Sequence, residues 1–82
     1  MGNHQQAIND FNKAIELNPQ YAEAYYARGS VYGYLKKYQQ AMTDFNKAIK
    51  LNPNNATAYY ARGTSYGYLE SHQQAIKASI KR

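Results

Sequence analysis

The chain has 82 residues, contains no cysteine and carries a formal net charge of +5. A chain of this length forms one domain at most and buries only about 60% of its unfolded surface, which excludes a deep cleft between lobes. The lack of cysteine excludes disulfides and thiol chemistry; together with the absence of a signal peptide or a membrane span, it favours a cytoplasmic protein.

The first predicted helix covers residues 3–17. Apolar residues recur at helical spacing from Ala7 to Ile15, and polar residues lie between them. Asn18 and Pro19 follow and end the helix. The stretch therefore presents one apolar face.

The second predicted helix, residues 21–35, has two distinct faces on a helical wheel. One face, the expected core, holds Tyr25, Arg28, Gly29, Tyr32 and Leu35. The opposite face holds Glu23, Tyr26, Ser30, Gly33 and Tyr34. This second face is too rich in aromatic residues for an ordinary solvated surface.

Three further helices are predicted over residues 38–51, 55–69 and 72–81. The fourth copies the second, and the fifth begins as a copy of the third. The fifth then departs, because Ala78 and Ser79 stand where the third helix has Asp44 and Phe45. A terminal repeat that turns polar is typical of a cap.

The sequence repeats itself with a period of about 34 residues. The repeated pattern is Tyr25-x-x-Arg28-Gly29-x-x-Tyr32, then Ala41-x-x-x-Phe45, then Pro53. It resembles the tetratricopeptide repeat. The resemblance implies an all-α fold, a right-handed superhelical α-solenoid of antiparallel helix pairs, here with five helices. Residues 1–82 then form a single domain: 1–21 the second half of a repeat, 22–55 a full repeat, and 56–82 a repeat with a polar, truncated end.

Two arginines replace the leucine that the family carries on its core face. A buried charge without a partner is costly. We predict structural ion pairs between Arg28 and Asp10 and between Arg62 and Asp44, because each Asp precedes its Arg by the same interval. The alternative is that each arginine reaches water along its aliphatic stem.

The sequence contains no constellation that would support catalysis. An acidic pair, a Ser/His/Asp set, a phosphate loop and a metal-ligand cluster are all missing. His4 and His72 occupy the repeat position that holds Tyr38, so we interpret them as turn-packing residues. We therefore expect a protein that is not an enzyme and has no cofactor and no metal.

The resemblance implies that the first helix of each pair lines a concave groove. We predict a peptide-binding groove formed by Glu23, Tyr26, Ser30, Gly33, Tyr34, Thr57, Tyr60, Thr64, Gly67 and Tyr68. Tyrosine offers a flat, partly apolar contact with a polar tip, which suits a peptide or a helix. The alternative is a smooth groove without a dedicated ligand. Some family members clamp acidic C-termini with Lys, Asn and Arg, but the corresponding positions here are Tyr, Ala, Ser and Thr.

Two other functions stay open. Nucleic-acid binding would fit the positive charge, but most lysines fall on the second helix of each pair and do not interleave with the tyrosines. Self-association is the stronger alternative, because Ile8, Phe11 and Ile15 on the first helix should lack cover. The start in mid-repeat and the near-identical units suggest an excised or engineered piece of a longer array.

The turns supply a second route to self-association. Residues 35–38 and 69–72 join paired helices without the glycine that the family usually has there. We expect ordinary hairpins at both. The alternative is that the helices fuse into one and exchange partners between copies.

Overall fold

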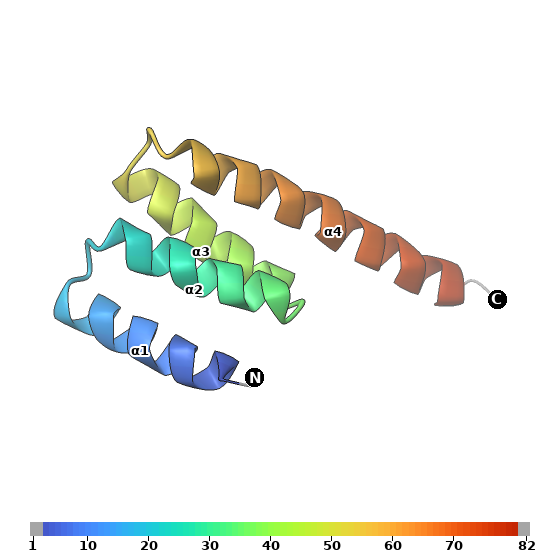
Figure 1. Cartoon of the computed structure of the whole chain (residues 1–82). Helices are drawn as coiled ribbons and strands as arrows, with labels where there is room; N and C mark the ends of the chain where they lie inside the picture. Colours follow the sequence, from blue (N-terminus) through green and yellow to red (C-terminus); the bar gives the residue numbers. More distant parts are fainter. Residues whose placement is uncertain (1–2, 81–82) are drawn as a thin grey trace.

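The computed structural model describes residues 3–80, and for residue 72 and residues 74–80 it describes the backbone only. This part of the chain forms four helices: α1 (His4–Leu17), α2 (Ala22–Tyr34), α3 (Tyr38–Leu51) and α4 (Ala56–Ile80). Each helix runs antiparallel to the one before it, and α4 runs back along α3 and continues beyond it (Figure 1). The predicted all-α fold is thus confirmed.

The predicted number of five helices is wrong. The expected fourth and fifth helices are joined in the 25-residue α4, which continues through residues 69–72 without a turn. Leu69, Glu70 and Ser71 contain no helix breaker, so the backbone can remain helical there. The expected polar cap at Ala78 and Ser79 concerns side chains that lie outside the described ones.

The other hairpin, at residues 35–38, is confirmed. Lys36 adopts a left-handed conformation with φ of 66°. The N–H of Lys37 donates to the Tyr32 carbonyl at 2.8 Å, and the N–H of Lys36 donates to the Gly33 carbonyl at 3.0 Å. This is the Schellman arrangement that ends a helix, adopted here by a lysine although glycine is the usual residue at that position.

The core is centred on α3, which packs between α2 and α4. Ala41, Phe45 and Ala48 of α3 are buried, with Phe45 only 2% exposed. Their spacing places them on one side of the helix, as the apolar periodicity of residues 38–51 requires. Ala48 also contributes to a cluster with Ile49 and Ala58, against which Tyr25 and Tyr26 pack. α3 therefore holds its two neighbours in register.

The two connections that follow α1 and α3 use the same local chemistry. The N–H of Tyr21 donates to the Asn18 carbonyl at 3.0 Å. The N–H of Asn55 donates to the Asn52 carbonyl at 3.2 Å. The side chain of Asn55 then accepts the N–H of Ala58 at 3.1 Å and caps α4. These turns direct α2 and α4 back along the preceding helix.

The long α4 gives the molecule an extended shape. The radius of gyration is 14.1 Å, whereas a compact domain of this length would have about 12 Å. The second half of α4 projects beyond the stack (Figure 1). In the described part of the chain, no helix combines the length and the apolar character needed to cross a membrane.

Candidate functional site

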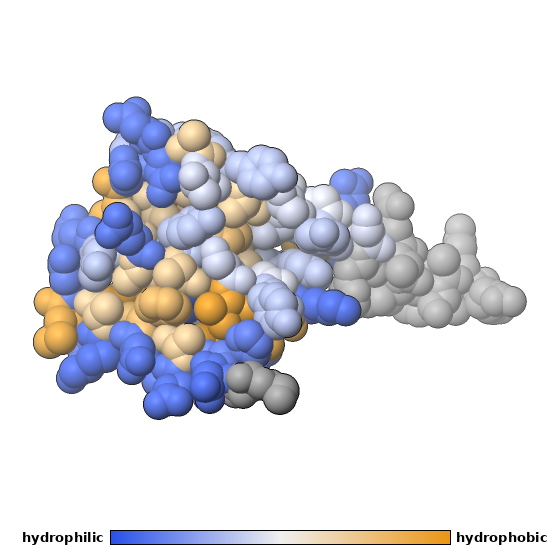
Figure 2. All heavy atoms as spheres, in the orientation of Figure 1, coloured by the Kyte–Doolittle hydropathy of each residue, from blue (hydrophilic) through white to orange (hydrophobic). Residues whose placement is uncertain are grey.

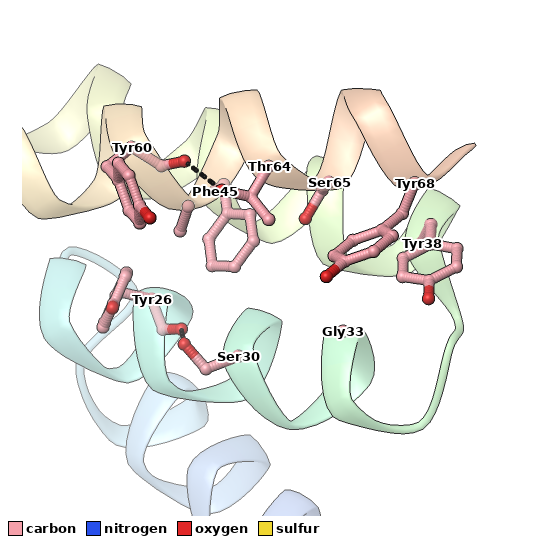
Figure 3. Close-up of a pocket in the computed structure, with 10 residues that line it drawn as sticks. Tyr26, Ser30, Gly33, Tyr38, Phe45, Tyr60, Thr64, Ser65 and Tyr68 are labelled. Carbon is pink, nitrogen blue, oxygen red and sulfur yellow. Dashed lines mark hydrogen bonds between the residues drawn. The ribbon is translucent and has the colours of Figure 1, made fainter. Parts of the chain in front are cut away.

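A groove of about 280 Å³ lies between α2 and α4, above α3. Figure 3 shows α2 along one wall and α4 along the other, with two rings of α3 between them. Its lining consists of Tyr26, Ser30, Gly33, Tyr38, Phe45, Tyr60, Ala61, Thr64, Ser65 and Tyr68. None of these described lining residues is charged.

Aromatic rings form the floor and one end of the groove. The ring centroids of Tyr26 and Phe45 are 5.6 Å apart and tilted by 41°. Tyr38 and Tyr68 stack with centroids 5.5 Å apart and an angle of 18°. Offset and tilted arrangements of this kind are favourable for aromatic pairs. The rings are therefore held in place before any ligand arrives.

The short hydroxyl side chains of the walls bond within their own helices. Ser30 Oγ donates to the Tyr26 carbonyl at 3.1 Å, and Thr64 Oγ1 donates to the Tyr60 carbonyl at 3.0 Å. Both bonds are drawn in Figure 3. With these hydroxyls engaged, the polar groups best placed to recognise a ligand are the phenol hydroxyls of Tyr26, Tyr60 and Tyr68.

The structure brings together only part of the predicted groove. The residues that line it as predicted are Tyr26, Ser30, Gly33, Tyr60, Thr64 and Tyr68. Thr57 and Gly67 are exposed on α4 but do not belong to the lining. Glu23 lines a separate hollow between α1 and α2, and Tyr34 packs on His4 with centroids 4.7 Å apart. Glu23 and Tyr34 therefore belong to the interface between α1 and α2, one repeat before the groove.

Sequence reasoning missed the contributions of Tyr38, Phe45 and Ser65 to the groove. Tyr38 and Phe45 lie two turns apart on α3, so helical spacing places them on one face. Phe45 belongs both to the core and to the floor of the groove. The stacking of Tyr38 on Tyr68 matches the contact of His4 with Tyr34 one repeat earlier.

The arginine of α2 forms a two-pronged ion pair with α3. Arg28 donates from Nε to Asp44 Oδ2 at 2.8 Å and from Nη2 to Asp44 Oδ1 at 2.7 Å. Its Nη1 donates to Asn12 Oδ1 at 2.7 Å. The hydrogen bond to Asp44 raises the pKa of Arg28, against an opposing effect of burial. Arg28 therefore ties α2 to both α1 and α3.

The predicted pairing partners are wrong. Arg28 selects Asp44 of the following helix instead of Asp10, because Asp44 is almost fully buried, with 3% exposure, and faces α2. Arg62 does not pair with Asp44, whose two oxygens are engaged by Arg28. Arg62 donates instead to Asn46 Oδ1 at 2.8 Å, the equivalent of the Arg28 bond to Asn12.

The predicted self-association surface on α1 is only partly open. Ile8 is buried at 4% exposure, contrary to expectation, while Phe11 and Ile15 are half-buried. Ile8 is covered because α1 packs its apolar stripe onto α2.

No group of three or more His, Cys, Asp or Glu residues that could hold a metal ion occurs among the described residues.

Comparisons with known proteins find the same repeat along the chain. Family profiles described as "Tetratricopeptide repeat" match residues 22–55 and 45–77, and one described as "TPR repeat" matches residues 1–35. A comparison with curated proteins gave no match. Among solved structures, 22 chains match.

One of these structures is the crystal structure of MamA protein. It superposes with a TM-score of 0.82 at 32% sequence identity over 98% of the present chain. The chain spans 44% of the length of that structure. The likeness therefore covers the helical stack described above and leaves the rest of the larger protein without a counterpart.

Proposed function

Because the chain belongs to the tetratricopeptide repeat family, whose repeats generally serve as protein–protein interaction modules, we propose that it is a non-enzymatic scaffold that binds a peptide or a helix between α2 and α4. In this proposal the helix pairs stack as part of a right-handed superhelical solenoid, and the groove lies on its concave side.

The observation that carries the proposal is an aromatic groove without charge in its described lining. A volume of about 280 Å³ is at the lower end for small-molecule sites. It suits one or two anchoring side chains of a longer chain better than a whole ligand. The expected anchors are apolar or aromatic, since a charged side chain would lose its hydration without gaining an ionic partner.

The same lining disfavours nucleic acid. Binding to a phosphate backbone depends on Lys and Arg and weakens steeply with salt. No described residue that lines the groove carries a positive charge. A peptide complex formed in this groove should therefore keep its affinity when the salt concentration is raised.

A peptide-display selection against the 82-residue chain tests the proposal. Selected peptides should carry an apolar or aromatic anchor and should bind the Tyr60→Ala variant at least about tenfold more weakly, because central aromatic contacts dominate such interfaces. Tyr60 is exposed in the free protein, so its loss should not disturb the fold. Tyr66→Ala is the matched control, since Tyr66 is also exposed on α4 and lies outside the groove. Equal effects of the two variants would refute the groove as the binding site.

A further inference from the structure

The first half of α4 has a face that lacks the cover of its counterpart in α2. We call this the open face of α4; its residues are Tyr59, Arg62, Gly63 and Tyr66. The equivalent residues of α2 are Tyr25, Arg28, Gly29 and Tyr32, which pack toward α3 and α1. Tyr59 and Tyr66 are 44% and 51% exposed, whereas Tyr25 and Tyr32 are half-buried. Within residues 3–80 the chain does not fold back over this face, because α4 continues straight (Figure 1).

The glycines show that the open face has the shape to receive a helix. A methyl group at Gly29 would lie 2.8 Å from Cε1 of Phe45 and 3.0 Å from Cβ of Asp44, so the approach of α3 requires a glycine there. A methyl group at Gly63 would meet no atom within 4 Å in the described structure. Position 63 thus carries the glycine that close helix packing requires at position 29, although no described helix packs against it.

The charge on the open face lacks its expected counterpart. Arg28 has both an asparagine on one side and a carboxylate on the other. Arg62 has the asparagine, Asn46, and stacks over the ring of Tyr59 at 5.3 Å. Among the described side chains it forms no salt bridge, and the position equivalent to Asp44 is Ala78 in the sequence.

The two groups that the open face lacks, a carboxylate for Arg62 and an aromatic ring to pack on Gly63, are both present on α1. This helix differs from α3 only where His4, Ile8, Asn9 and Glu16 replace Tyr38, Met42, Thr43 and Lys50. Asp10 and Phe11 of α1 match Asp44 and Phe45 of α3. Asp10 is exposed and Phe11 half-buried, whereas both α3 residues are almost fully buried. Phe11 and Ala14 line the hollow beside α2, and apolar residues gather over α1 and α2 on the face seen in Figure 2.

We propose that α1 of a second copy docks on the open face of α4 and completes a composite repeat. Asp10 of the second copy then pairs with Arg62, as Asp44 pairs with Arg28. Phe11 packs on Gly63, as Phe45 packs on Gly29. Lys13 lies over Tyr59, as Lys47 lies 5.9 Å from the ring centroid of Tyr25. Each contact reproduces one that the chain already makes between α2 and α3.

The occupant is a second copy because α1 and α4 lie at opposite ends of one stack and cannot meet within it (Figure 1). The contact is head-to-tail, so each copy leaves one end available and the assembly grows or closes into a ring. It uses the side of α4 opposite the groove lining. The proposal is therefore independent of peptide binding, and either can fail without the other.

A pair of glycine substitutions tests the packing part of the proposal. Gly63→Ala and Gly67→Ala both replace a glycine of α4 that has open space around it, and both raise its helix propensity equally. Only Gly63 matches the tight contact at Gly29, since a methyl group at Gly33 would sit 3.9 Å from Ala41 in ordinary contact. Sedimentation equilibrium should show self-association weakened about tenfold or more by Gly63→Ala and hardly changed by Gly67→Ala.

Charge reversal tests the ionic part. Asp10→Lys and Arg62→Glu should each lose self-association when measured alone. Mixed together they should form complexes, because the intact Arg62 of one variant meets the intact Asp10 of the other. Glu16→Lys makes the same change of charge on α1, and it gives α1 the residue that α3 carries at the equivalent position, Lys50. Lys47 lies beside Tyr25 in the presence of Lys50, so loss of the exposed Lys13–Glu16 pair should leave this variant associating like the parent chain. Circular dichroism of each variant checks that it is folded; because Asp10 is exposed, its replacement should leave the fold intact.

Two results would overturn the proposal. One is a parent chain that stays monomeric up to millimolar concentration, which would leave the open face to a different partner. The other is self-association that is equally sensitive to Gly63→Ala and Gly67→Ala, or a mixture of the two charge variants that stays monomeric.

Discussion

Residues 22–51 and residues 56–80 begin with nearly the same sequence and end in different folds. In the first region α2 ends at Tyr34, the chain turns through Lys36, and α3 packs back against α2. In the second region the equivalent residue, Glu70, lies inside the continuous α4. The first halves of the two regions are alike. The sequences diverge at the turn, where Lys36 and Lys37 correspond to Glu70 and Ser71, and in the residues that follow it.

The comparison indicates that the turn at Lys36 is stabilised by the packing of the residues that follow it in α3. The left-handed conformation of Lys36 costs about 1 kcal/mol. Burial of a residue such as Phe45 contributes about 1.5 to 3 kcal/mol, and the Asp44 pair with Arg28 adds to it. After Glu70 the sequence has Ala78 and Ser79 instead. Packing these small residues back against α4 would contribute less free energy than Phe45 and Asp44 do, so the backbone keeps its helical hydrogen bonds.

The carboxylates provide the largest expected contrast between equivalent positions. Asp44→Ala should lower the free energy of unfolding by about 3 kcal/mol, because it leaves the Arg28 guanidinium partly buried without its ionic partner. Asp10→Ala, the same change one repeat earlier, should alter it by less than about 0.5 kcal/mol at an exposed site. Urea unfolding of dilute, monomeric protein measures both. Equal losses would contradict the assignment of Asp44 as the partner of Arg28.

The glycines give the next contrast. Gly29→Ala should destabilise the protein by about 1 to 2 kcal/mol, since the added methyl group would collide with Phe45 and Asp44. Gly63→Ala in the monomer should stabilise it by about 0.5 to 1 kcal/mol through helix propensity alone. The shift of the thermal midpoint should thus have opposite signs. A loss of stability in the Gly63 variant would mean that another part of the chain covers the open face.

The smallest effect concerns the two turn positions. Lys36→Gly should stabilise the monomer by about 0.5 to 1 kcal/mol, because glycine adopts the left-handed conformation without strain. Glu70→Gly should destabilise it by about the same amount, because glycine weakens the interior of α4. Chemical denaturation of both variants checks the signs. If Glu70→Gly were also stabilising, residue 70 would lie in a turn like that at Lys36.

Much of the fold could be predicted from the sequence because helical periodicity and the repeat are both encoded locally. The bounds of α1 and α3 and the face of α2 that holds Tyr25 and Gly29 follow from spacing alone. Whether residues 69–72 turn could not be predicted in this way. That outcome depends on the balance between helix continuation and distant packing, and no local motif records it.

The groove could be predicted in part for a similar reason. Helical spacing identified Tyr26, Ser30 and the tyrosines of α4, but it could not reveal that α3 supplies the floor through Tyr38 and Phe45. The ion pair shows the same limit. The repeat places one aspartate before Arg28, Asp10, and one after it, Asp44. Either could pair with Arg28, and only the packing of α2 against α3 selects Asp44.

A single distance tests the central claim, that the segment after Leu69 extends α4 and leaves its face open. Spin labels at Gly63→Cys and Ser79→Cys, in a chain without native cysteine, report it by pulsed electron resonance. The label at residue 63 also blocks docking of a second copy, so the distance is measured within one molecule. A straight α4 predicts backbone positions about 24 Å apart. A hairpin like that of α2 and α3 would place them about 10 Å apart, and that result would contradict the account.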